Sequence, residues 1–387
     1  MLAFVLLMRL RVRFALLGLL PAIAGAWLAC GPKGFQDSAL VNSVRILATR
    51  ADHPYAKPGD TVTLSVLADD GRSSQPEPMV IYWFPVALAP PLSLPLPKAS
   101  FVCEDPKDDA YFACFASLLS AIGDAGARPD GAAGDAGKPG LSLGPGVDLS
   151  SFLPQGPTFS VPISQDIIEN HPLVNGTQPY GLALVFNMAC AGHPELLPVD
   201  SSNLSFNQLP VGCFDKHGTQ LDADSFVVGY ATVYVYDKLT NDNPVIDNLV
   251  YQGKILDGGY LGDSSTADAG VPDEGGIVVP TCTNTDRDAC ATYSFNIEVP
   301  SMSWQTDPQN IGPNGQPLHE QVWVDYYWTA GDFSDDSRLI DDPTVGSVGN
   351  TAVTLTPPAF PTTATFWAVV HDNRGGVAWD VVPYQVK

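Results

Sequence analysis

The stretch DTVTLSVL at residues 60–67 alternates polar and apolar side chains with a period of two. This period is typical of a β-strand with one buried face, and it directs Val62, Leu64 and Val66 toward a core. Similar short runs, separated by Pro and Gly breaks, predict further strands at residues 44–48, 79–86, 159–162, 180–189 and 229–236. Because long helical periods are missing, the chain is expected to be all-β and built of sandwiches.

The second half of the chain repeats this pattern. The run NPVI at residues 243–246 opens it, much as VRI at 44–46 opens the first half. Residues 292–299 alternate, and VWVDYYW at 322–328 is the counterpart of the strand that carries Trp83.

The end of the chain predicts a β-hairpin. Apolar runs at residues 364–370 and 377–386 flank the turn DNRGG at 372–376. Glycine supplies the positive φ that such turns require, so the two runs are expected to pair.

These features resemble immunoglobulin-like and fibronectin-like domains, which carry a tryptophan on the third strand and close with a hairpin. The resemblance implies two antiparallel β-sandwich domains, at residues 42–240 and 241–387. It departs from antibody-type domains because no cysteine lies on the second strand of either half.

The closing residues also resemble uncharacterised lipoproteins of myxobacteria, in the runs WAVV at 367–370 and RGG at 374–376. Linkers rich in Ala, Asp and Gly add to this resemblance. It implies no activity.

Two insertions interrupt the strand pattern. The first, at about 88–156, holds a proline-rich run, a short helix with apolar residues at helical spacing, and the low-complexity residues 124–140. A composition of Ala, Gly, Asp and Pro buries no core, so 124–140 is expected to be disordered. A second such loop, expected to be flexible, covers about 257–276.

The N-terminus has the pattern of an export signal at residues 1–29. Arg9, Arg11 and Arg13 precede an apolar run at 14–29, which is shorter than the roughly 20 residues of a membrane span. Starting translation at Met8 instead of Met1 would give a more regular signal.

A small residue, Ala29, directly precedes Cys30, as in bacterial lipoprotein signals, so Cys30 is the predicted lipidation site. Trp27 departs from the usual leucine three residues before the cysteine. The alternative is ordinary secretion, with Cys30 left as a free or paired thiol.

The predicted anchor and tether, residues 30–41, would hold the first domain close to the bilayer. Gly31 takes the place of the aspartate that retains some lipoproteins at the inner membrane, which favours the outer membrane. The expected location is the cell envelope, in the periplasm or exposed at the surface.

The seven cysteines support the anchor, since an odd thiol in an exported protein needs a reason. Without Cys30, six remain, and they lie in three couples close in sequence. The predicted disulfides are Cys103–Cys114, Cys190–Cys213 and Cys282–Cys290.

The charge balance argues against nucleic acid as a partner. Removing the signal leaves 16 lysines and arginines against 42 aspartates and glutamates. A surface this acidic repels phosphate backbones.

An acidic linker between the two predicted domains resembles the calcium linker of cadherins. Its candidate ligands are Asp237, Asn241, Asp242 and Asn243, because calcium prefers carboxylate, amide and carbonyl oxygens. The spacing departs from the cadherin form, and a hydrated turn is the alternative. Otherwise no cofactor is expected.

Enzyme signatures are missing from the sequence, with no nucleophile elbow, zinc-protease motif or phosphate-binding loop. Trp323 and Tyr327 fall on one face of their strand and would stack on sugar rings if that face were exposed. Protection of a sheet edge or contact between domains explains them equally well. The predicted function is therefore non-catalytic binding, adhesion or scaffolding by a lipid-anchored envelope protein, with an unknown protein or glycan partner. The alternatives are a carbohydrate-binding surface lipoprotein, or an envelope hydrolase whose cleft is built by the first insertion.

Overall fold

The computed structural model describes residues 38–84, 146–169, 178–197, 211–256 and 276–387. Several predictions lie outside these residues: the signal at 1–29, lipidation of Cys30, the Cys103–Cys114 pair, the short helix, and the loops at 124–140 and 257–275. Val41–Lys387 forms one compact unit, and the domain boundary at 240/241 stays a prediction. The described part of the chain contains no helix with the length and hydropathy of a membrane span.

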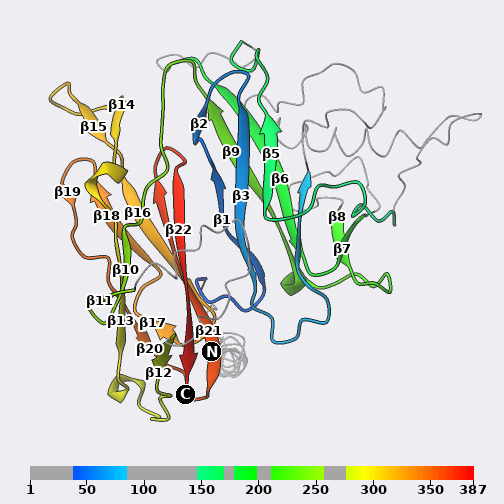
Figure 1. Ribbon diagram of the computed structural model, residues 1–387, viewed down its shortest axis with the longest axis vertical. Coiled ribbons are helices and arrows are strands. Elements are labelled where there is room, and N and C mark those ends of the chain that lie inside the picture. Colours follow the sequence, from blue (N-terminus) through cyan, green and yellow to red (C-terminus); the bar gives the residue numbers. More distant parts are fainter. Residues whose placement is uncertain (1–37, 85–145, 170–177, 198–210, 257–275) are drawn as a thin grey trace, which may run out of the picture. The chain divides into compact units, whose positions relative to one another are not determined.

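The described residues are all-β, as predicted. Their regular structure consists of strands and of single turns of 3-10 helix at Ala223–Ser225, Arg287–Ala289 and Ser301–Ser303. The strands form two sandwiches, which can be followed in Figure 1 from blue to green and from light green to red.

The first sandwich packs two sheets against each other. One sheet has the order β1-β3-β5, and the other has the order β2-β9-β6-β4. Their bounds are β1 (Val44–Ala51), β2 (Tyr55–Ala56), β3 (Thr61–Asp70), β4 (Val80–Phe84), β5 (Thr158–Pro162), β6 (Gly181–Cys190) and β9 (Phe226–Val235).

The core of this sandwich follows the predicted alternation. Val62, Leu64 and Val66 on β3 are buried and pack against residues of β4, β6 and β9. Trp83 is fully buried, and its indole Nε1 donates a hydrogen bond to the carbonyl of Gly156 at 2.8 Å. The tryptophan on the third major strand is thus part of the core, as its sequence context indicates.

The second sandwich is built in the same way. Its two sheets have the orders β11-β10-β13-β20-β17 and β12-β22-β21-β16-β18-β19. The first sheet comprises β10 (Asn248–Tyr251), β11 (Lys254–Ile255), β13 (Tyr293–Glu298), β17 (Asp332–Phe333) and β20 (Val353–Thr356). The second comprises β12 (Ile277–Val279), β16 (Val322–Trp328), β18 (Ser337–Asp342), β19 (Gly346–Ser347), β21 (Thr362–Asp372) and β22 (Val377–Val386).

Both sandwiches share one strand order. In the first sandwich, the sheet β1-β3-β5 faces the sheet β2-β9-β6-β4. In the second sandwich, the corresponding strands are β10-β13-β20 in one sheet and β12-β22-β21-β16 in the other. In each sandwich, a short edge strand pairs in parallel with the last strand, while the other major pairs are antiparallel. This is the immunoglobulin-type arrangement. Strand β16 therefore corresponds to β4, as the sequence comparison of the two halves predicts.

The closing hairpin is also confirmed, since β21 and β22 pair from Thr362–Val386 to His371–Val377. The opening of the second half is not. Residues 243–246 are not part of a strand, and the first strand of that sandwich begins at Asn248. Their polar groups bond elsewhere: Asn243 bonds to two other segments, and the Val245 N–H donates to the Ser303 hydroxyl.

Two further hairpins are added to the sandwiches: β7 (His193–Leu196) with β8 (Val211–Phe214), and β14 (Thr306–Ile311) with β15 (Pro317–His319). Cys190 pairs with Cys213 and Cys282 with Cys290, each with Cα atoms 5.8 Å apart. Both pairs are those expected from the sequence.

Candidate functional site

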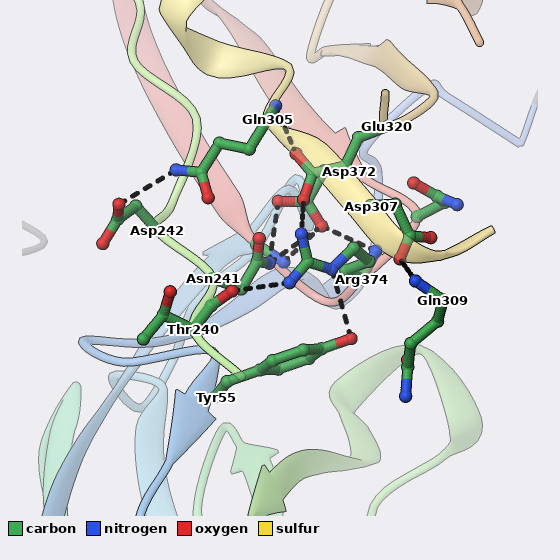
Figure 2. Close-up of polar contacts among 12 residues, drawn as sticks. Tyr55, Thr240, Asn241, Asp242, Gln305, Asp307, Gln309, Glu320, Asp372 and Arg374 are labelled. Carbon is green, nitrogen blue, oxygen red and sulfur yellow. Dashed lines mark hydrogen bonds and ion pairs between the residues drawn. The ribbon is translucent and has the colours of Figure 1, made fainter. Parts of the chain in front are cut away.

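Polar residues from five distant segments meet in a buried cluster where the two sandwiches adjoin (Figure 2). The segments are β2, the linker between β9 and β10, β14, the residues that lead into β16, and the turn of the closing hairpin. We call this group the joint cluster; its members are Tyr55, Thr240, Asn241, Asp307, Glu320, Asp372 and Arg374.

Arg374 lies at the centre of the joint cluster and is 6% exposed. Its Nη1 donates to Glu320 Oε1 at 2.7 Å, and its Nη2 donates to the Thr240 carbonyl at 2.5 Å. Its Nε donates to the Tyr55 hydroxyl at 3.3 Å, and the guanidinium carbon lies 4.7 Å from the centre of the Tyr55 ring. One side chain of the second sandwich thus binds the linker and the first sandwich together.

Asp372 shapes the turn that carries Arg374. Its Oδ1 accepts hydrogen bonds from the backbone N–H groups of Arg374 at 2.7 Å and Gly376 at 2.8 Å. The Asn241 side-chain amide donates to Oδ2 at 3.2 Å. A Cβ at residue 376 would lie 2.0 Å from Asp372 Oδ2, so this close approach requires glycine.

The charges in the cluster do not balance. Glu320, Asp372 and Asp307 are 0%, 3% and 6% exposed, and a single guanidinium, that of Arg374, lies among them. Burial, followed by the charge of Asp372, raises the pKa of Glu320 to about 7. Burial also raises the pKa of Asp372 above its usual range. Buried carboxylates resist ionisation when they lack full compensation.

The linker amides are used for hydrogen bonding between the sandwiches. Asn243 donates to the Ala51 carbonyl at 2.8 Å and accepts from the Val377 N–H at 2.9 Å. Asp242 accepts from the Gln305 side chain at 2.9 Å, whereas Asp237 is exposed. Of the four residues predicted as calcium ligands, Asn241, Asp242 and Asn243 therefore bond to separate partners, and Asp237 is exposed.

Among the described residues, no group of three or more His, Cys, Asp or Glu side chains is arranged to hold a metal ion. Calcium binding at the linker stays a prediction.

An apolar patch completes the contact between the sandwiches. Val41, Leu47, Ala48 and Leu67 pack against four residues of the closing hairpin, Trp367, Val369, Val377 and Trp379. Arg50 lies over Trp379, with its guanidinium carbon 4.6 Å from the ring centre. Buried apolar area of this kind stabilises the contact independently of the charges.

Trp323 and Tyr327 share one face of β16, as the alternation predicts, but both are engaged. Tyr327 packs against the apolar patch, and Arg45 lies 6.0 Å from its ring centre. The Trp323 ring stacks on His371 with centroids 5.2 Å apart, and its Nε1 donates to Asp325 at 3.3 Å. Contact between the sandwiches, one of the explanations open at the sequence level, accounts for Tyr327.

The sequence did not single out Glu320 or Arg374 for this role. Arg374 enters the sequence analysis only as part of the predicted turn at 372–376. The signal in the sequence is the presence of polar residues next to strongly apolar strands. Such residues are expected to be buried and hydrogen-bonded, because buried polar groups need partners. The side-chain partners of Arg374, Glu320 and Tyr55, lie 54 and 319 residues away from it in sequence and are not readable from spacing.

Spacing in the sequence also does not predict the carboxylate–histidine pairs, two of which lie in the second sandwich. His319 Nδ1 lies 2.6 Å from Asp341, which is 1% exposed. His371 Nε2 lies 3.4 Å from Asp325. In the part of the chain that the structure describes, neither imidazole contacts a serine or cysteine nucleophile.

No protein-family model matches the chain, and no curated protein matches it. Among solved structures, the D0-D1 domain of intimin aligns over 88% of this chain and 97% of its own, with 11% identity and a TM-score of 0.18. Escherichia coli alpha-2-macroglobulin activated by porcine elastase aligns over 92% of this chain and 22% of its own, with 10% identity and a TM-score of 0.18. At such TM-scores the likeness carries no argument, and the fold rests on the strand order alone.

Proposed function

We propose that this chain is a lipid-anchored cell-envelope protein that acts as a non-catalytic binding, adhesion or scaffolding module. The observation that supports this best is the joint cluster, together with the apolar patch beside it. The polar side chains of the cluster and the apolar side chains of the patch both form contacts between the two sandwiches. A protein built this way presents the second sandwich in a fixed orientation to a partner.

The proposed anchor is Cys30. The export signal before it and the odd cysteine count support lipidation at this position. With the first sandwich tethered by residues 30–41 and the second fastened to it, the proposed site of partner binding is on the second sandwich.

The proposal favours a protein partner over a glycan. A sugar would stack on exposed aromatic rings, and the two candidate rings already contact other side chains of the chain. Binding through strand edges and loops of a sandwich is the common alternative for such folds.

The anchor is tested by metabolic labelling with a radioactive fatty acid. The wild-type protein is expected to take up label, and the Cys30→Ser variant is expected to lack it. Equal labelling of a Cys103→Ser control would show that the loss is specific to Cys30. An unlabelled wild-type protein would contradict the proposed anchor.

Exposure of the second sandwich at the cell surface is tested by protease shaving of intact cells, followed by immunoblotting for that sandwich. Loss of signal supports adhesion or recognition of external ligands. Protection until the outer membrane is opened contradicts a surface role and leaves scaffolding in the periplasm.

A further inference from the structure

We propose that the joint cluster is a proton-linked clamp: a proton on Glu320 tightens the contact between the two sandwiches, and its loss loosens that contact. This inference is independent of the lipid anchor. It rests on the position of Glu320 and on the charges that surround it.

Glu320 has no exposed surface, so water does not solvate its charge. Its Oε2 accepts one backbone hydrogen bond, from Gln305 N–H at 3.0 Å, and its Oε1 accepts from Arg374. The same arginine also binds Thr240 and Tyr55. Glu320 therefore shares the guanidinium of Arg374 with two other acceptors.

The groups that face this carboxylate from the other elements are mostly neutral or negative. The hairpin contributes Asp372 and Arg374, β14 contributes Asp307, and β2 contributes the Tyr55 hydroxyl. The linker contributes Asn241 and, through Gln305, Asp242. The neighbouring imidazole, His319, is directed to Asp341 instead. Ionised Glu320 would thus give three buried carboxylates around one guanidinium.

Glu320 is the acid expected to take the proton. Asp372 accepts two backbone N–H bonds and an amide N–H, and bonds of that kind favour its charged form. Asp307 accepts the Gln309 N–H at 2.9 Å. Glu320 has fewer donors than Asp372 and is more buried than either aspartate, which agrees with its pKa of about 7.

The direction of the pH effect follows from this shift. The pKa of Glu320 is raised in the folded chain from an ordinary value of 4.5. Its contribution to stability is therefore fully present below about pH 4.5 and is lost as the pH rises through about 7. For one linked proton, the population of the opened joint increases by up to about tenfold per pH unit between about pH 4.5 and 7, and it levels off above about 7, where both states have lost the proton.

Hydrogen exchange of the full chain at pH values between about 4.5 and 7.5 tests the clamp, because the linked proton is lost in this range. The reporters are the backbone N–H groups of Arg374, Gly376 and Val377, which bond within the joint. After correction for intrinsic exchange rates, their protection in the wild type is expected to fall as the pH rises. In the Glu320→Gln variant, which carries no charge to lose, protection is expected to be independent of pH.

Asp380→Asn is the matched control. Asp380 is a buried acid on β22 whose pKa is raised to about 6 by burial, and it is not a member of the joint cluster. This variant is expected to keep the pH dependence of the reporters. Wild-type protection that does not change with pH, or a Glu320→Gln profile equal to the wild type, would overturn the clamp.

A direct titration covers the case in which Glu320→Gln fails to fold. Carbon-13 NMR of the side-chain carboxyl of Glu320 in the wild-type chain is expected to show a midpoint near neutral pH. A midpoint near 4.5 would overturn the proposal, because Glu320 would then carry no proton under neutral conditions.

Discussion

At the residue scale, Arg374 is the side chain on which the joint depends. It is nearly as buried as Glu320, with side-chain exposures of 5% and 0%, and the two form an ion pair at 2.7 Å. Buried pairs of this kind contribute little to net stability when both partners are replaced, but the loss of one partner leaves a buried charge without compensation. The joint is therefore sensitive to single substitutions.

Replacing Arg374 with Gln is expected to destabilise the protein by about 3–5 kcal/mol at neutral pH, because Glu320 and Asp372 lose their shared cation. Urea unfolding followed by circular dichroism measures this change. The control is Arg287→Gln, which breaks the more exposed pair with Asp332 and is expected to cost about 0–1 kcal/mol. Equal losses in the two variants would contradict the role given to Arg374.

Calcium provides a second prediction at this scale. Asn241 and Asn243 already donate and accept hydrogen bonds in the joint, and Asp242 accepts from Gln305. Thermal unfolding is therefore expected to have the same midpoint in calcium as in chelator. A higher midpoint in calcium, lost in an Asp237→Asn and Asp242→Asn double variant, would instead support the cadherin-like linker.

At the element scale, the strand pattern was predictable and the linker was not. Period-two alternation depends on local chemistry, so the buried face of β3 and the pairing of β21 with β22 follow from the sequence. The start of the second sandwich was misread, because NPVI at 243–246 has the composition of a strand. Tertiary hydrogen bonds of Asn243 and Val245 determine its conformation instead.

The disulfides give a prediction about individual elements. Cys190–Cys213 joins the end of β6 to β8 across 23 residues, whereas Cys282–Cys290 closes a loop of 8. Because loop-closure entropy grows with loop length, removing the first by double Ser substitution is expected to cost about 3.4 kcal/mol, and removing the second about 2.5 kcal/mol. Denaturant unfolding of the two double variants tests the order. A larger loss for Cys282–Cys290 would contradict it.

At the scale of the whole molecule, two sandwiches of one strand order lie within a single compact unit. Their repetition is visible in the sequence through the counterpart strands β4 and β16. The contact between them is not visible, because it combines Tyr55, Asn243 and Arg374 from segments separated by more than 100 residues. A sequence reading of independent domains on a linker therefore misses the joint.

The central claim is that the joint makes the two sandwiches unfold together. Hydrogen-exchange mass spectrometry across a urea series measures the unfolding midpoints of β4, in the first sandwich, and β13, in the second, in the same sample. The account predicts a single shared midpoint for wild-type protein near pH 6, and separate midpoints for the Arg374→Gln variant. Separate midpoints in the wild type would contradict it, since the sandwiches would then be independent despite their contacts.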